Sequence, residues 1–293
     1  MAEGACAMTA YGTSAIKRFR STKDQISELD SAILDYVAVQ NPITVRGIFY
    51  AMSVRGHVPK NDAGYRRVQR RVLDLRRASA MPYGWVSDST RWQHAVDLHN
   101  GLDDLLDEMQ RLYKRDFWRV MPEHVQVWCE KEALAGVLSE ATYKWRVPLF
   151  VSRGFASETY LFESAESIRR LDKPVHIYLF TDYDAAGLDI DTKIREGLER
   201  FGEGAEIHFH RAALTPEQIR EMDLPTRDPK PRDVERGIRR CVELDAIPPK
   251  TLIEMVENVI SGHVDGEMLD HMLVVEAAER ETLKNIKLPG WPS

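Results

Sequence analysis

Three carboxylates follow two apolar segments that have the length of buried strands. Glu130 comes after residues 125–129, and Asp182 and Asp184 come after residues 177–181. Short apolar runs bounded by turn residues predict buried strands of a parallel sheet, whose ligands bind beyond the carboxyl ends of the strands. Carboxylates at one edge repel each other unless they share a cation, and oxygen ligands suit Mg²⁺. The residues therefore predict a Mg²⁺ site, with Mn²⁺ as the alternative metal.

The two aspartates also have a purely structural interpretation. A helical pattern runs from about residue 188 to residue 201, and Asp is a favoured N-cap. An isolated Asp-x-Asp would favour the cap. The matching Glu130 at the end of another predicted strand favours the metal site instead.

Arginines form a second group of residues with a chemical role. Residues 41–92 contain ten arginines and lysines against three aspartates, a net charge of +7, so the rest of the chain carries −13 of the total of −6. Such asymmetry is typical of a basic nucleic-acid-binding module on an acidic body, although an arginine-rich helix can also be a solvated face. The candidate nucleic-acid-binding residues are Arg66, Arg67, Arg70, Arg71, Arg76 and Arg77.

These arginines lie on the third of three predicted helices. Apolar spacing predicts helices over about 23–39, 44–54 and 63–79, with Thr44 able to cap the second. Residues 82–92 are predicted to form a small β-wing. Three helices followed by a wing are typical of a winged helix-turn-helix, whose third helix enters a groove of double-stranded DNA.

Strands and helices alternate through the middle of the chain. Strands are predicted over residues 125–129, 148–151, 177–181 and 205–210. Helices are predicted over residues 131–145, 157–171 and 188–201. This alternation with short connections predicts the α/β class, with a parallel sheet covered by helices on both faces.

Composition limits the classes of protein that the chain can belong to. Of its 293 residues, 43% are hydrophobic and 29% are charged, which supports real cores and about two domains. No apolar run approaches the roughly 20 residues of a membrane span. Three widely separated cysteines without a CxxC pair argue against a zinc site or a disulfide framework. A cytoplasmic, nucleoid-associated protein is expected.

With these residues in view, the chain resembles a known family. A glutamate after one strand and Asp-x-Asp after a later one resemble a Toprim domain. A winged helix ahead of it resembles the A subunit of topoisomerase VI and the meiotic double-strand-break transesterase, especially their short stand-alone bacterial and phage relatives. The matching motifs are Arg46-Gly47-Ile48-Phe49-Tyr50, Arg153-Gly154-Phe155 and Asp182-Tyr183-Asp184-Ala185-Ala186-Gly187.

The resemblance implies magnesium-dependent DNA cleavage by tyrosine transesterification. Tyr50 would attack the DNA, and Arg46 would bind the scissile phosphate or lower the phenol pKa. Glu130, Asp182 and Asp184 would hold the metal. The family arrangement also implies a homodimer, in which the tyrosine of one protomer faces the metal site of the other. Because nothing in the chain resembles an ATP-binding loop, strand passage would need a separate ATPase subunit.

Departures from the family motifs leave other functions open. Gly47 replaces an acid, Phe49 a tyrosine and Ala185 a proline. The alternatives are a metal-dependent hydrolytic Toprim nuclease of a defence system or mobile element, in which water attacks and Tyr50 is structural, and a non-catalytic DNA-binding protein.

The resemblance also divides the chain. We expect a flexible arm (1–24), a winged-helix domain with the candidate tyrosine (25–94), a helical connector (95–120), a Toprim domain (121–215) and a largely helical C-terminal extension (216–293). In the extension, Glu243 and Asp245 precede Pro248-Pro249. They are interpreted either as extra metal ligands or as surface acids before a helix.

Overall fold

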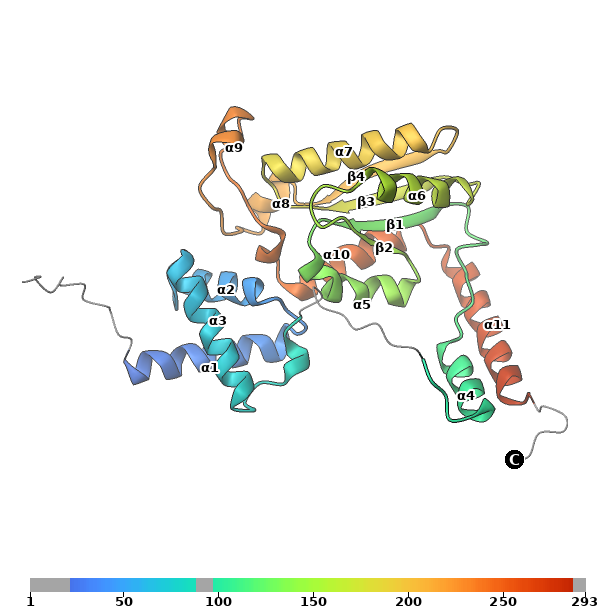
Figure 1. Ribbon diagram of the computed structural model, residues 1–293, viewed down its shortest axis with the longest axis horizontal. Helices are drawn as coiled ribbons and strands as arrows, with labels where there is room; N and C mark the ends of the chain where they lie inside the picture. Colours follow the sequence, from blue (N-terminus) through green and yellow to red (C-terminus); the bar gives the residue numbers. More distant parts are fainter. Residues whose placement is uncertain (1–21, 88–96, 287–293) are drawn as a thin grey trace, which may run out of the picture.

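Three helices begin the described part of the chain, which covers residues 22–87 and 97–286 of a computed structural model (Figure 1). They are α1 (Lys23–Val39), α2 (Val45–Val54) and α3 (Asp62–Arg77). Each starts at a polar cap, because the side chains of Thr22, Thr44 and Asn61 accept a hydrogen bond from the backbone N–H three residues later. Their apolar faces form one hydrophobic core. The three predicted helices are therefore confirmed; the predicted arm lies almost wholly outside the described residues.

The predicted wing is not found in the part that the structure describes. Residues Tyr83–Trp85 form a short 3₁₀ helix, η1, and Val86 makes only an isolated parallel bridge to Ile43. Trp85 is half-buried against the core of the three helices, so this segment packs as a turn and does not pair as a hairpin. The rest of the predicted wing, residues 88–92, lies outside the described ranges.

A four-stranded parallel sheet forms the centre of the remaining chain. Its strands are β1 (His124–Cys129), β2 (Leu149–Val151), β3 (Val175–Phe180) and β4 (Ile207–Ala213), in the order β2-β1-β3-β4. Their side chains alternate between two apolar layers, as expected for strands buried on both faces. All four predicted strands and their parallel arrangement are confirmed, with bounds that differ from the predicted ones by up to three residues.

Helices cover both faces of this sheet (Figure 1). One face carries α6 (Glu158–Arg169) and α7 (Ala185–Phe201), whose apolar residues pack on Ile177 and Leu179 of β3. The other face carries α5 (Ala135–Trp145), which follows the short 3₁₀ helix η2 (Glu132–Leu134). The α/β class is therefore correct, and the helices continue the alternation that the sequence predicted.

The C-terminal segment shares the core of the sheet. It contains α8 (Pro216–Glu221), α9 (Pro231–Glu235), η3 (Leu244–Ala246), α10 (Pro249–Ser261) and α11 (Gly266–Lys284). Leu252, Val256 and Ile260 of α10 are fully buried in the same cluster as β1 and α5. The boundary expected at residue 216 therefore divides one continuous core, because these helices bury their apolar faces against the sheet.

The predicted connector is only partly helical. Its helix, α4 (Leu102–Leu112), packs against α11, and the two project together from the body of the protein (Figure 1). After it, Phe117 and Trp118 are buried in the sheet core. No helix in the described ranges is both long enough and apolar enough to cross a membrane.

The helical unit, which consists of α1, α2 and α3, packs against the C-terminal segment. Helix α2 contacts η3, and Ala246 of η3 packs into the core of the three helices. The residues around η3 therefore link the N-terminal helices to the carboxyl edge of the sheet, where the predicted site lies.

Candidate functional site

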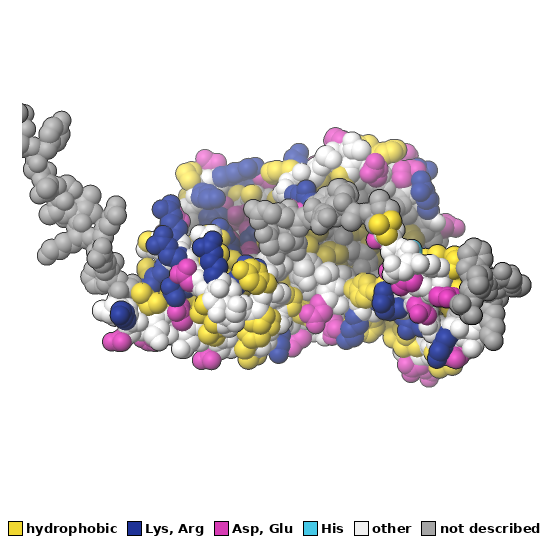
Figure 2. All heavy atoms as spheres, turned by 60° about the horizontal axis from the view of Figure 1, so that its bottom comes forward, with side chains coloured by type: hydrophobic (Ala, Val, Ile, Leu, Met, Phe, Trp, Pro, Cys, Tyr) yellow, Lys and Arg dark blue, Asp and Glu magenta, His cyan; other side chains and the backbone are white. Residues whose placement is uncertain are grey.

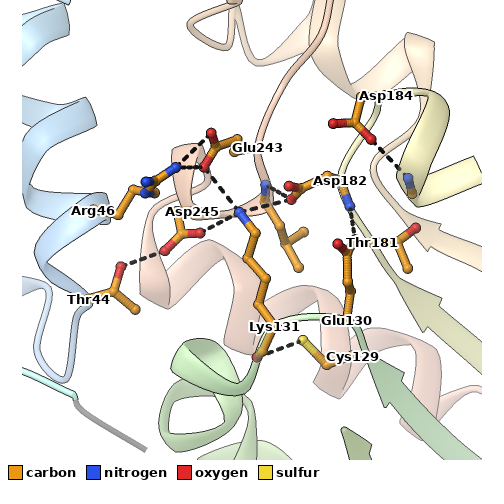
Figure 3. Close-up of polar contacts among 12 residues, drawn as sticks. Thr44, Arg46, Cys129, Glu130, Lys131, Thr181, Asp182, Asp184, Glu243 and Asp245 are labelled. Carbon is orange, nitrogen blue, oxygen red and sulfur yellow. Dashed lines mark hydrogen bonds and ion pairs between the residues drawn. The ribbon is translucent and has the colours of Figure 1, made fainter. Parts of the chain in front are cut away.

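Glu130 and Asp182 meet at the carboxyl edge of the sheet (Figure 3). The register pairs Cys129 with Phe180, so β1 and β3 end at the same level. The backbone N–H of Asp182 donates to Oε2 of Glu130 at 3.3 Å, and Oδ1 of Asp182 accepts from the backbone N–H of Leu244 at 2.8 Å. The Asp182 side chain is buried. The structure thus brings together two of the three predicted ligands, as their positions after neighbouring strands required.

Asp184 is engaged differently from Asp182. It is the N-cap of α7, with Oδ1 accepting from the backbone N–H of Gly187 at 2.8 Å. Its Oδ2 accepts from Arg227 at 2.6 Å. The capping interpretation therefore describes Asp184 in this structure, and a metal at Asp184 would have to exchange with the Arg227 guanidinium.

The glycine of the Asp-x-Asp-x-x-Gly motif is required by close packing. A Cβ atom on Gly187 would lie 2.1 Å from the carbonyl oxygen of Asp182. Only glycine lets the first turn of α7 approach the end of β3 this closely. The motif thus fixes the path of the backbone between the two aspartates.

The three predicted ligands share an edge but do not form a ready-made coordination shell. Within the described ranges, only Glu123, His176 and His263 bring at least three ligand atoms within 4.8 Å of one another. At the sheet edge Lys131 is a cation that contacts one of the predicted ligands, Asp182, and two further acids, Glu243 and Asp245. Its Nζ lies 3.0 Å from Asp182, 3.2 Å from Glu243 and 2.7 Å from Asp245.

Glu243 and Asp245 are site residues that the sequence identified only as open candidates. Asp245 is 4% exposed and accepts a 2.6 Å hydrogen bond from the Thr44 hydroxyl. Glu243 accepts from Arg46 at 2.6 and 2.8 Å. Neither is a surface acid: both join α2 to the sheet edge through Lys131. In the sequence these two acids flank Leu244, which made them candidates. Their contacts with Thr44, Arg46 and Lys131 could not be predicted from that pattern.

Negative charge at this edge is only partly compensated. Burial, followed by the charge of Asp182, raises the pKa of Glu130 to about 7. Burial also raises the pKa of Asp182, although Lys131 opposes the shift. At Glu243 burial is outweighed by Lys131 and Arg46, so its pKa is lowered. The cations therefore stabilise the charged form of Glu243 more than that of Glu130. A hard divalent cation at this edge would stabilise the charged form of Glu130.

Tyr50 is buried beside this cluster. Its side chain is 6% exposed and packs in the core of the three helices, with its ring 5.4 Å from that of Phe49. Burial first, then the charge of Glu243, raise the pKa of its phenol, although Arg46 opposes the shift. Tyr50 also lines a 210 Å³ pocket with Asp245 and Pro225. The predicted pair of Arg46 and Tyr50 thus lies near the acids, with the phenol poorly activated.

A cleft joins the acidic edge to the helical unit. It has a volume of about 840 Å³ and is lined from the sheet side by Glu130, Asp182 and Asp184. From the helical side it is lined by Arg46 of α2 and Arg76 of α3. Groups that could bind a phosphate and groups that could hold a metal therefore face one solvent-filled space.

The six arginines of α3 do not all serve the same purpose. Arg71 forms a two-pronged contact with Asp30 of α1 at 2.7 Å and a 2.8 Å contact with Asp74. Arg76 stacks on the Tyr83 ring, and Arg67 contacts the Gln25 carbonyl at 3.4 Å. The exposed members whose side chains make no hydrogen bond or ion pair with any other described residue are Arg66, Arg70 and Arg77. Lysines and arginines gather over the N-terminal helices, on the left of Figure 2.

Comparison with known proteins does not assign the chain to a family. A scan against models of protein families found no match, and a search of curated proteins found none either.

Proposed function

We propose that the chain cleaves DNA in a magnesium-dependent reaction at the cleft between the helical unit and the sheet edge. The observation that carries this proposal is that one 840 Å³ cleft is lined by both the three carboxylates and the basic side chains of α2 and α3. A DNA duplex bound on α3 would thus present its phosphates to the acidic edge.

Glu130, Asp182 and Asp184 would hold the metal, with Asp184 exchanging Arg227 for it. The donor set is suited to this, since it consists of hard oxygens and the Glu130 carboxylate forms no ion pair with any residue that the structure describes. Bound Mg²⁺ would stabilise the charge that develops on the transferring phosphoryl group. Lys131 would keep Asp182 ionised and correctly placed through its 3.0 Å contact.

Hydrolysis by water is the reaction that this geometry supports best. A nucleophilic tyrosine must reach the phosphate and lose its proton. Tyr50 is nearly inaccessible, and its pKa is raised, so neither condition is favoured. Water has free access to the cleft. In this reading Tyr50 is a packing residue of α2.

Tyrosine transesterification is a second candidate, and one observation favours it. Arg46 and Tyr50 lie on successive turns of α2, beside Glu243 and Asp245, which contact Lys131 at the metal edge. This route requires α2 to move so that the buried phenol is exposed at that edge. In the related arrangement implied by the motif resemblance, two copies of the chain would share each site.

Incubation with supercoiled plasmid and Mg²⁺ tests both candidates. We expect nicked or linear DNA from the wild type and none from Asp182→Asn. Tyr50→Phe removes only the hydroxyl, so it should cut at the wild-type rate if water attacks. Loss of cutting by Tyr50→Phe, with protein covalently bound to DNA in the wild type, would establish transesterification. Absence of Mg²⁺-dependent cutting by the wild type on supercoiled, linear and single-stranded DNA would overturn the proposal.

A further inference from the structure

Histidines gather at the end of the sheet opposite to the acidic edge. The β3–β4 register pairs His176 with His208, and His210 lies two residues further along the same face of β4. His263, just after α10, packs on them, with its ring 4.3 Å from that of His176. Strand alternation and the C-terminal end of α10 thus bring four imidazoles together on one face of the sheet.

A carboxylate completes this cluster. Oε2 of Glu123, the residue before β1, lies 2.6 Å from Nδ1 of His263 and 3.4 Å from Nε2 of His176. One ligand atom from each of the three residues lies within 4.8 Å of the others. We propose that Glu123, His176 and His263 form a binding site for a divalent transition cation of the zinc class.

The donor set and its spacing carry the proposal. Two imidazole nitrogens and one carboxylate oxygen, with a fourth position for water, are a common Zn²⁺ ligand set. Tetrahedral coordination at about 2.1 Å needs ligand atoms about 3.4 Å apart, which is the separation of His176 and Glu123. The shorter contact between His263 and Glu123 is a hydrogen bond that would open by less than 1 Å as its proton leaves.

The second nitrogen of each ring already has an orienting partner. Nδ1 of His176 lies 3.0 Å from Nε2 of His210, and Nε2 of His263 lies 2.7 Å from the Tyr178 hydroxyl. Metal-binding histidines nearly always have such a partner, which fixes the tautomer and the ring. Both rings are thus held with one nitrogen directed toward Glu123.

Access and selectivity also agree with a metal site. The two histidine side chains are 13–15% exposed, whereas that of Glu123 is 38% exposed. The open side therefore leaves room for a water ligand and for the arriving ion. Imidazole favours Zn²⁺ and its neighbours over Mg²⁺, which prefers oxygen.

This site is separate from the acidic edge and does not depend on the proposed function. His176 lies near the start of β3 and Asp182 two residues beyond its end, and this separation of six residues corresponds to about 20 Å at the rise of an extended strand. Occupancy of one site can thus be measured while the other is blocked.

Titration with Zn²⁺ in excess Mg²⁺, and with Co²⁺ as a spectroscopic probe, tests the assignment. We expect one equivalent to bind to the wild type, with a visible Co²⁺ absorption band of tetrahedral type. The band and the single equivalent should disappear in His176→Ala and in His263→Ala. His210→Ala, which removes only an orienting partner, should weaken binding by about 10–100-fold.

Three control variants make the result specific. His208→Ala removes a stacked ring that is not a ligand, His271→Ala removes an exposed histidine of α11, and Asp182→Asn alters the acidic edge. All three should bind one equivalent with wild-type affinity, and circular dichroism should show all variants folded. Wild-type protein without the band, or an unchanged band in His176→Ala and His263→Ala, would overturn the proposal and leave a hydrogen-bonded histidine network.

Discussion

Replacement of Lys131 by methionine tests the electrostatics of the acidic edge most directly. The Lys131 ammonium contacts three carboxylates, and its side chain is only 19% exposed. Methionine keeps most of the volume but removes the charge, so Asp182 and Asp245 would stay buried without their cation. Breaking a buried ion pair from one side costs about 3–5 kcal/mol. We expect the free energy of unfolding in EDTA to fall by this amount.

Added Mg²⁺ should reverse part of the loss if the metal binds at this edge. A ligand at about 100 times its dissociation constant stabilises the folded state by about 2.7 kcal/mol. The variant has more uncompensated negative charge, so Mg²⁺ should stabilise it more than it stabilises the wild type. Urea unfolding followed by tryptophan fluorescence can measure both effects, since Trp118 and Trp128 are buried in the two layers of the sheet.

A surface lysine provides the matched control. Lys144 contacts Glu257 at 2.6 Å, but its side chain is 62% exposed. Exposed pairs are worth about 0–1 kcal/mol, so Lys144→Met should change stability by less than 1 kcal/mol, with no dependence on Mg²⁺. An equally small loss in Lys131→Met would refute the conclusion that Lys131 holds the acids together. An equal response of variant and wild type to Mg²⁺ would place the metal elsewhere.

Four further predictions concern the arginines of α3, His124 and Gly187. The three exposed arginines of α3 are Arg66, Arg70 and Arg77. Their replacement by alanine should make the fall of log K for duplex DNA with log salt less steep, by up to about 3 in the slope, because each phosphate contact releases counterions. Arg71→Gln should leave that slope nearly unchanged but lower the free energy of unfolding, since Arg71 joins α3 to Asp30 of α1. A changed slope with unchanged stability would contradict this structural role of Arg71. Burial lowers the pKa of His124 to about 4. The unfolded chain therefore binds this proton at a higher pH than the folded protein does, and the free energy of unfolding should fall as the pH drops from about 6.5 toward 4. His124→Gln should make this fall smaller, and a variant with the same pH profile as the wild type would contradict the prediction. Gly187→Ala should abolish Mg²⁺-dependent DNA cutting and destabilise the protein, because its Cβ would collide with the Asp182 carbonyl; a fully active variant would disprove the packing argument.

Local patterns in the sequence determined most of the elements. Helices α1, α2 and α3 begin at or within a residue or two of the predicted starts, because caps such as Thr44 and the apolar spacing act within a few residues. The strands could also be predicted from the sequence, since burial on both faces produces short apolar runs. Two of the three predicted acids meet because parallel strands end at one edge.

Tertiary structure decided which partners the charged residues have. Asp184 and Arg227 are 43 residues apart, and Arg46 and Glu243 are 197 apart, so no local pattern could join them. The same holds for Asp30, which removes Arg71 from the set of free arginines. Burial of Tyr50 likewise depends on how α2 packs in the helical core.

The histidine cluster marks the limit of sequence reasoning most clearly. His176, His210 and His263 come from β3, β4 and the end of α10, and no spacing relates them. Only the pairing of β3 with β4 and the packing of α10 on the sheet bring their rings into contact. Sequence thus determined the elements and the residue types, because these depend on local periodicity and capping. The fold alone decided which side chains meet, because those contacts depend on how distant segments pack.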